Sequence, residues 1–377
     1  MNKVSHAHEK EKSCDGCASL KDHKKLEANT FFAFSTSLIE FLKAFPEVLI
    51  KWLKKKIFVA GLAAAIFLVF YLELAGVKTG PFLNRTMIFA TPLLFGTLGE
   101  IYAERSGVLN LGIEGIMSTG AAVGIVGAFV AGNAWAGVAL GMMSGALLAF
   151  LFAIVAVHLR GMQVPAGLGL FMLGLGLSGV IGVARAGEKL PYRFTRTPIP
   201  VLSDIPVLGE LLFQHVFLVY LALILVPTMW FVLFKTRIGL NIRTVGENPA
   251  AADSAGVNVF RIRYLCVSLG GALAGLGGAF FSIAWMGYWL EGMIAGWGWL
   301  VIALTIFSLW DPIGALLGSL LFGGMHALQF ELQGLGFPIH ILGMLPYLVT
   351  LIALSSLLLF IRRLGAPSAL LQPYTRE

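Results

Sequence analysis

Long apolar segments separated by short polar connections follow one another along most of the chain. A helix needs ~20 predominantly apolar residues to cross the hydrocarbon core of a bilayer, and the segments are close to that length. The pattern therefore predicts an all-α integral membrane protein, a polytopic helical bundle of about ten transmembrane segments. The expected segments are 57–76, 87–103, 108–131, 135–158, 162–187, 211–234, 264–287, 293–310, 312–330 and 341–361.

Two regions precede the first of these segments. Residues 1–30 alternate charges of both signs without an apolar core, which is typical of a polar cytoplasmic tail. In residues 31–56, apolar residues such as Phe34, Leu38 and Leu42 recur at helical spacing before a basic flank. This periodicity predicts either an amphipathic helix at the membrane interface or a helix packed on the protein's own cytoplasmic side, and it does not separate the two.

The composition excludes a water-soluble fold. Of the 377 residues, 58% are hydrophobic and 12% are charged, and the mean hydropathy is +0.85. A soluble domain carries about 25% charged residues. Since no set of residues resembles a catalytic dyad or triad, we expect neither an enzyme nor a bound cofactor.

The net charge of +7 does not indicate nucleic-acid binding. More than half of it arises within residues 1–56, where Lys54, Lys55 and Lys56 directly precede the first apolar segment. Basic residues at that place contact anionic lipid headgroups and keep their flank in the cytoplasm. Counted over all connections, the bias of basic residues predicts that both termini, including the tail at 362–377, are cytoplasmic.

The three cysteines are too few and too unevenly placed for a disulfide framework. Cys14 and Cys17 form a single CxxC pair beside histidines of the tail, which is a weak indication of zinc. A lone pair of this kind is more often without metal, so we expect no metal site.

Glycine is abundant, with 45 residues, and it interrupts several apolar segments. The stretches 107–115 and 296–298 are the clearest, and such stretches are where transporters break helices around a cavity. The run of glycines at 270–278 also allows helices to approach closely. We therefore expect a tightly packed bundle with interrupted helices.

A short helix is expected inside the cytoplasmic loop 235–263. Asn248 suits the position that caps a helix, Pro249 suits the first helical position, and Gly256 suits the position after the end. A helix of this length is not stable alone in water, so something must pack on it. Its side chains, including Ala252, are mostly alanine, which fits either a docking knob for another protein or an ordinary connecting helix on the bundle.

Two groups of polar or aromatic residues within the spans are candidates for a substrate path. Asn110 and Glu114 are spaced as on one helix face, and Glu114 is the one acidic residue we single out inside a span. They fit either a path lining or a structural role, in which they cap a broken helix or bridge neighbouring helices. Trp285, Tyr288 and Trp289 are spaced as on one helix face, followed by Glu291. They fit either a substrate gate or an aromatic belt at the interface.

Several motifs resemble, in order, those of ATP-binding cassette importer permeases of the branched-chain amino acid, ribose and nucleoside superfamily. Residues 236–259, TRIGLNIRTVGENPAAADSAGVNV, resemble the region of the coupling helix. Residues 104–115, ERSGVLNLGIEG, resemble the signature of the branch that handles nucleosides and simple sugars. Further similar stretches are 270–279, 310–324 and 345–350.

The resemblance implies a permease domain at 57–361 that translocates a nucleoside or simple sugar across a bacterial inner membrane by alternating access. It implies three partners: a second, related permease subunit, a cytoplasmic ATPase that binds the ATP, and an extracytoplasmic substrate-binding protein. The ATPase-coupling residues would be Gly246, Glu247, Asn248, Pro249, Ala252 and Gly256. The chain has no G-x-x-x-x-G-K-[ST] loop of its own. The alternative is an ion-coupled secondary transporter or a channel, and a scaffold without transport would leave the interrupted helices unexplained.

Overall fold

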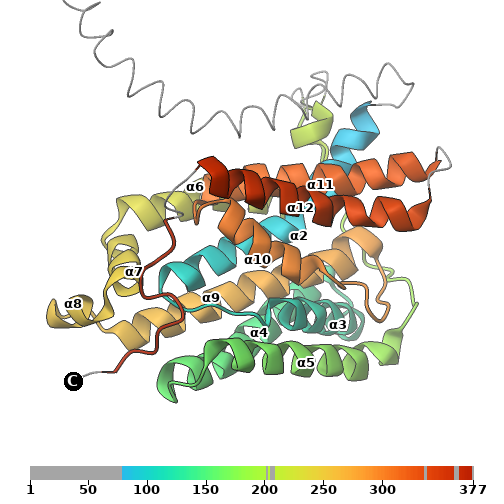
Figure 1. Cartoon of the computed structure of the whole chain (residues 1–377). Coiled ribbons are helices and arrows are strands. Elements are labelled where there is room, and N and C mark those ends of the chain that lie inside the picture. The colour runs from blue at the N-terminus through green and yellow to red at the C-terminus, as the bar shows by residue number, and fades with distance from the viewer. Residues whose placement is uncertain (1–78, 201–202, 204–208, 335–337, 361–364, 376–377) are drawn as a thin grey trace, which may run out of the picture. The chain divides into compact units, whose positions relative to one another are not determined.

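The computed structural model describes residues 79–200, 203, 209–334, 338–360 and 365–375. Its named elements in these ranges are all helical (Figure 1). The α-helices are α2 (Thr79–Arg105), α3 (Ile113–Ala131), α4 (Ala134–Ala153), α5 (Gln163–Gly182), α6 (Phe217–Lys235), α7 (Arg237–Glu247), α8 (Pro249–Ser254), α9 (Val259–Ala279), α10 (Trp297–Phe307), α11 (Pro312–Gly334) and α12 (Ile339–Phe360).

Within these ranges, 7 helices are long and apolar enough to cross a membrane. They are α2, α3, α4, α5, α6, α9 and α11, of which α4 and α9 are lengthened by π-helical stretches at Ile154–His158 and Phe280–Met286. The apolar parts of α10 and α12 are shorter. The chain is therefore a polytopic helical membrane protein.

The predicted and observed segments correspond one to one wherever the structure describes the chain. The largest difference concerns α2, which begins at Thr79 and not at 87. In the range 293–310 the helix covers only Trp297–Phe307, because the residues before it form turns. The first predicted span, the amphipathic region and the polar tail with its CxxC pair lie outside the described residues.

Helix α9 lies at the centre of the bundle, against α2, α3 and α4. Its glycines make this possible: a Cβ on Gly278 would overlap the carbonyl oxygen of Met117 in α3, and one on Gly271 would overlap the carbonyl oxygen of Gly145 in α4. Small residues let helix backbones approach closely, which replaces hydrophobic driving force inside a bilayer. The expectation of tight glycine packing is confirmed.

Candidate functional site

The turn between α2 and α3 carries the first candidate, Asn110. Its side-chain Oδ1 accepts a hydrogen bond from the backbone N–H of Gly112 at 2.9 Å, and its own N–H donates to Glu100 Oε1 at 2.9 Å. The prediction that Asn110 shares a helix face with Glu114 is wrong, because α3 begins only at Ile113 and Asn110 lies in the glycine-rich turn before it. Asn110 is buried and stabilises the turn.

Glu114 connects the start of α3 to the break before α10. The side chain is 5% exposed, and its Oε1 accepts a hydrogen bond from the N–H of Gly296 at 3.1 Å. Gly296 has φ +87° and directly precedes α10, and a Cβ on Gly298 would overlap the backbone of Glu114. Of the two alternatives for Glu114, this geometry favours a bridge between helices.

The aromatic residues expected to share one face lie apart. The helix that carries Trp285 ends at Gly287, which turns with φ +72°, so helical spacing does not continue to Tyr288 and Trp289. Trp285 packs edge-on against Phe89 of α2, with ring centroids 4.7 Å apart. Tyr288 is half-buried in the connection that follows. The prediction of a common aromatic face is therefore wrong.

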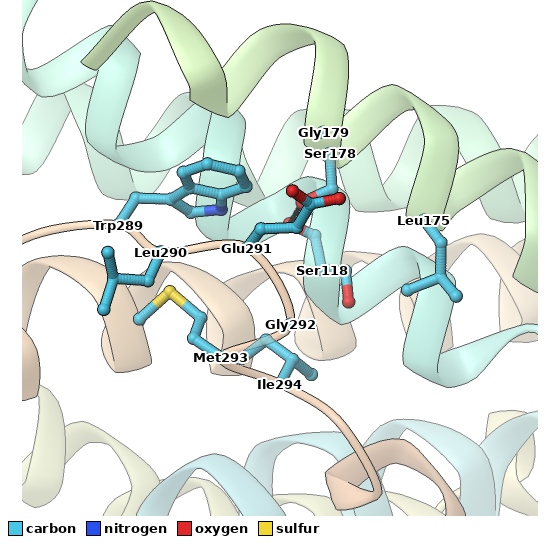
Figure 2. A pocket seen from close by; sticks show the side chains of 10 residues that line it. All are labelled: Ser118, Leu175, Ser178, Gly179, Trp289, Leu290, Glu291, Gly292, Met293 and Ile294. Carbon is cyan, nitrogen blue, oxygen red and sulfur yellow. Dashed lines mark hydrogen bonds between the residues drawn. The ribbon is translucent and has the colours of Figure 1, made fainter. Parts of the chain in front are cut away.

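A pocket of about 170 Å³ lies between α3, α5 and the connection that leads into α10. Figure 2 shows the Glu291 carboxylate extending toward Ser178 and Gly179 of α5, with Trp289 beside it. The residues that line the pocket are Ser118, Leu175, Ser178, Gly179, Trp289, Leu290, Glu291, Gly292, Met293 and Ile294. Among the predicted path residues Glu291 lines it, and four do not: Asn110, Glu114, Trp285 and Tyr288.

The groups around this pocket suit a small polar solute in part. Glu291 is exposed, and a carboxylate accepts hydrogen bonds from hydroxyl groups. Trp289 is 3% exposed and supplies aromatic surface. The Ser178 hydroxyl donates to the backbone oxygen of Ser118 at 2.8 Å, which joins α5 to α3. The pocket volume is below the ~300 to 1,000 Å³ that is typical of complete small-molecule sites.

The short helix predicted in the cytoplasmic loop is present as α8. Asn248 caps it, accepting a hydrogen bond from the Ala251 N–H at 3.0 Å, and Pro249 is its first residue. Gly256 follows the end with φ +85° and donates its N–H to Asp253 O at 2.9 Å. The local signals for the start and the end are therefore confirmed.

Ala252 is not on an exposed docking surface, although the alanine-rich sequence suggests one. It is 3% exposed and belongs to a small apolar cluster with Val245, Val259 and Tyr374. A helix of six residues must bury one face to be stable, and this is the face that it buries. The alanines left exposed are Ala250, Ala251 and Ala255.

Gly246 and Glu247, at the end of α7, both contact the C-terminal segment. The Gly246 carbonyl accepts a hydrogen bond from Ala369 N at 2.9 Å, and Glu247 Oε2 accepts one from the Ser368 hydroxyl at 2.7 Å. A Cβ at Gly246 would overlap the carbonyl oxygen of Arg105, so only glycine fits there. The buried Gly246 and the exposed Glu247 thus hold the end of α7 against the C-terminal segment.

Two buried acids of α2 are additional polar groups within the bundle. Glu100 is 0% exposed and Glu104 is 1% exposed, and Glu104 Oε2 accepts the Trp310 indole N–H at 2.6 Å. Singling out Glu114 as the one acid inside a span was therefore wrong. Their spacing of four residues, which places both on one helix face, is the sequence signal that identifies them.

Arg263 is a further buried residue whose role is not evident from the sequence. It looks like one of several basic residues flanking the loop, yet it is 1% exposed in α9. Its Nε donates to Ser106 O at 3.1 Å and its Nη1 to Gln372 O at 3.2 Å. It therefore joins the turn after α2 to the C-terminal segment.

Metal binding finds no support in the part of the chain that the structure describes, where no group of three or more His, Cys, Asp or Glu side chains could hold an ion. The CxxC pair lies outside that part.

Comparison with known proteins identifies the family. Residues 82–354 match the family described as branched-chain amino acid transport system / permease component. A putative glucose ABC transporter permease of Haloferax volcanii is 39% identical over 78% of this chain and 97% of its own length. A nucleoside ABC transporter permease of Lactococcus lactis is 38% identical over 75% and 93%, and a guanosine ABC transporter permease of Bacillus subtilis is 37% identical over 77% and 95%.

No solved structure matches the chain. The sequence matches nevertheless decide between the two transport mechanisms considered above, because the relatives are subunits of ATP-driven systems and not ion-coupled transporters or channels. The chain belongs to the branched-chain amino acid transport system permease family, and it is a membrane permease subunit of an ATP-binding cassette importer, a transport component and not an enzyme.

Proposed function

We propose that this chain forms one half of the transmembrane unit of an importer for a nucleoside or a simple sugar. The observation that carries the proposal is the match to nucleoside, guanosine and glucose permeases at 37–39% identity over nearly their whole length. The ten-helix topology with both termini in the cytoplasm of an inner membrane belongs to the proposal. It would add the segment 57–76 to the described helices.

A second, related permease is the proposed partner in the membrane. A second permease from each of the same three organisms also resembles this chain, at lower identity: 25% for the Bacillus subtilis guanosine permease, 33% over a shorter stretch for the Lactococcus lactis nucleoside permease, and 23% for the Haloferax volcanii glucose permease. Each organism thus has two different permeases named for the same solute, which supports a heterologous pair over two identical chains.

The incomplete pocket beside Glu291 fits this arrangement. About 170 Å³ is too small to enclose a nucleoside or a sugar, so the partner permease would complete the site. In this proposal Glu291 accepts hydrogen bonds from solute hydroxyl groups, and Trp289 offers an apolar surface to a sugar or base face.

ATP would act through α8. We propose that a cytoplasmic ATPase docks on its exposed side, formed by Ala250, Ala251 and Ala255, while the capping residues Asn248 and Pro249 keep the helix folded. Closure of two ATPases would then move the two α8 helices, and the bundles would rock between outward-facing and inward-facing states. An extracytoplasmic binding protein would deliver the solute.

Uptake by cells that express the whole system tests the proposal. We expect ATPase-dependent uptake of labelled guanosine or glucose that unlabelled solute of the same class suppresses. Collapsing the ion gradient while ATP is maintained should leave uptake intact. Uptake that survives loss of the ATPase but stops with the gradient would contradict the proposal.

A further inference from the structure

The C-terminal segment, residues 365–375, is folded onto the surface that carries α8. Figure 1 shows it running beside α7 toward the end of the bundle where α8 and α9 begin. Pro367, Ala369 and Tyr374 are buried, although the segment contains no long apolar run. A sequence of this composition at a chain end is ordinarily a mobile tail, so its burial requires specific contacts.

Three elements hold the segment. At its start, Ser368 and Ala369 bond to the end of α7 as described above. In the middle, the Gln372 carbonyl accepts from Arg263 Nη1 at 3.2 Å. At its end, the Tyr374 hydroxyl donates to Asp253 Oδ2 of α8 at 3.0 Å, and the Tyr374 ring lies 5.8 Å from that of Phe260 in α9.

These contacts continue from α8 to the turn that leads into α3. Arg263, which holds Gln372, also donates from Nε to Ser106 O at 3.1 Å. Ser106 opens the turn in which Asn110 bonds to Glu100, and this turn precedes the start of α3 at Ile113. Helix α3 supplies Ser118 to the pocket. Hydrogen bonds, connected by short stretches of backbone between Gln372 and Tyr374 and between Ser106 and Asn110, thus join the short helix α8 to the helix that lines the pocket.

We propose that the C-terminal segment 365–375 is part of the ATPase-facing unit, and that Tyr374 and Arg263 are positioning residues that carry the displacement of α8 to the turn before α3. The inference rests on the proposed docking of the ATPase at α8. Because Ala252 and Tyr374 are packed in one apolar cluster, a push on α8 displaces the segment with it. The buried Arg263 then transmits that displacement, since its guanidinium bonds to both sides in a fixed geometry.

The test uses the complete transporter in proteoliposomes and measures the ATP hydrolysed per solute molecule imported. We expect Tyr374→Phe and Asp253→Asn each to leave ATPase co-purification unchanged and to raise this ratio about two- to tenfold, as the loss of one hydrogen bond warrants. The double variant should be no worse than the more affected single variant, because both changes remove the same contact. Tyr192→Phe is the control, because it removes a hydroxyl from an exposed tyrosine that is distant in sequence from Tyr374. Its ratio of ATP hydrolysed to solute imported should be normal.

Arg263→Lys keeps the charge but not the forked donor, so it should raise the ratio as well, whereas Arg237→Lys at the exposed start of α7 should not. A normal ratio in Tyr374→Phe, Asp253→Asn and Arg263→Lys overturns the inference. It leaves the proposed function standing if Ala251→Glu, on the exposed side of α8, still prevents ATPase docking. If Ala251→Glu also has no effect, the docking proposal itself fails.

Discussion

The indole N–H of Trp310 donates to Glu104 Oε2 at 2.6 Å in a site from which water is excluded. This contact ties the end of α2 to the connection between α10 and α11. Leu309 has φ +56° and Trp310 has φ +55°. Two consecutive residues other than glycine seldom adopt this left-handed conformation. The hydrogen bond to a buried carboxyl group is a physical reason why this conformation persists.

Trp310→Phe should destabilise the protein by about 1 to 3 kcal/mol, because it keeps an aromatic side chain, although a smaller one, but leaves a buried carboxyl oxygen without its donor. Thermal unfolding of the detergent-solubilised protein measures the effect. Trp299→Phe is the matched control, since Trp299 is 38% exposed and should shift the midpoint little. Equal shifts for the two variants would contradict the structural role of the contact.

Gly145→Ala should disrupt the packing of α4 on α9. The added Cβ would overlap the carbonyl oxygen of Gly271, and overpacking in a tight core costs about 1 to 3 kcal/mol. Gly169→Ala offers the matched control, because a Cβ there meets nothing within 4 Å. The yield of folded protein in detergent should fall for Gly145→Ala and stay unchanged for Gly169→Ala. The opposite order would show that the close helix approach is not a determinant of stability.

His215 makes stability depend on pH. Burial lowers its pKa below the ordinary value, because removal from water disfavours the imidazolium, although the Leu211 carbonyl at 2.8 Å partly opposes this. Below about pH 6.5 the unfolded chain takes up a proton that the folded chain does not, so stability should fall on acidification through that range. Thermal midpoints measured between neutral and mildly acidic pH check this. His215→Asn should flatten the dependence, and an unchanged slope would contradict the assignment.

Glu291→Gln should weaken uptake of the solute about two- to tenfold through a higher KM, since an amide oxygen is a poorer acceptor than a carboxylate for solute hydroxyl groups. Glu188→Gln is the control, because Glu188 is exposed, bonds to Arg185 and does not line the pocket. Initial rates of labelled uptake as a function of solute concentration distinguish the two. A normal KM in Glu291→Gln would exclude that residue from the path.

Much of the fold follows from the sequence because its signals are local. Hydrophobic length identifies the spans, and Asn248, Pro249 and Gly256 define the ends of α8 through backbone chemistry that tertiary structure does not change. The run 293–310 shows the limit. Its apolar residues predict one span, yet Gly296 has a left-handed conformation and donates its N–H to Glu114, and the helix begins only at Trp297.

The site was less predictable because it depends on contacts between distant segments. Spacing alone placed Asn110 on a helix and Tyr288 beside Trp285, whereas glycines end the helices in between. Arg263 reads as a surface base because nothing local reveals that Ser106 and Gln372 supply buried acceptors. The burial of Ala252 likewise depends on Tyr374, more than one hundred residues away in the chain.

ATP-driven uptake by the purified complex carrying Ala251→Glu tests the central claim most directly. Ala251 is exposed on α8, so a charge there should leave the fold intact but oppose ATPase docking, and uptake should fall about tenfold or more. Ala131→Glu, at an exposed alanine closing α3, is the control and should transport normally. Unimpaired uptake and ATPase binding in Ala251→Glu would contradict the account that α8 links this permease to its ATPase.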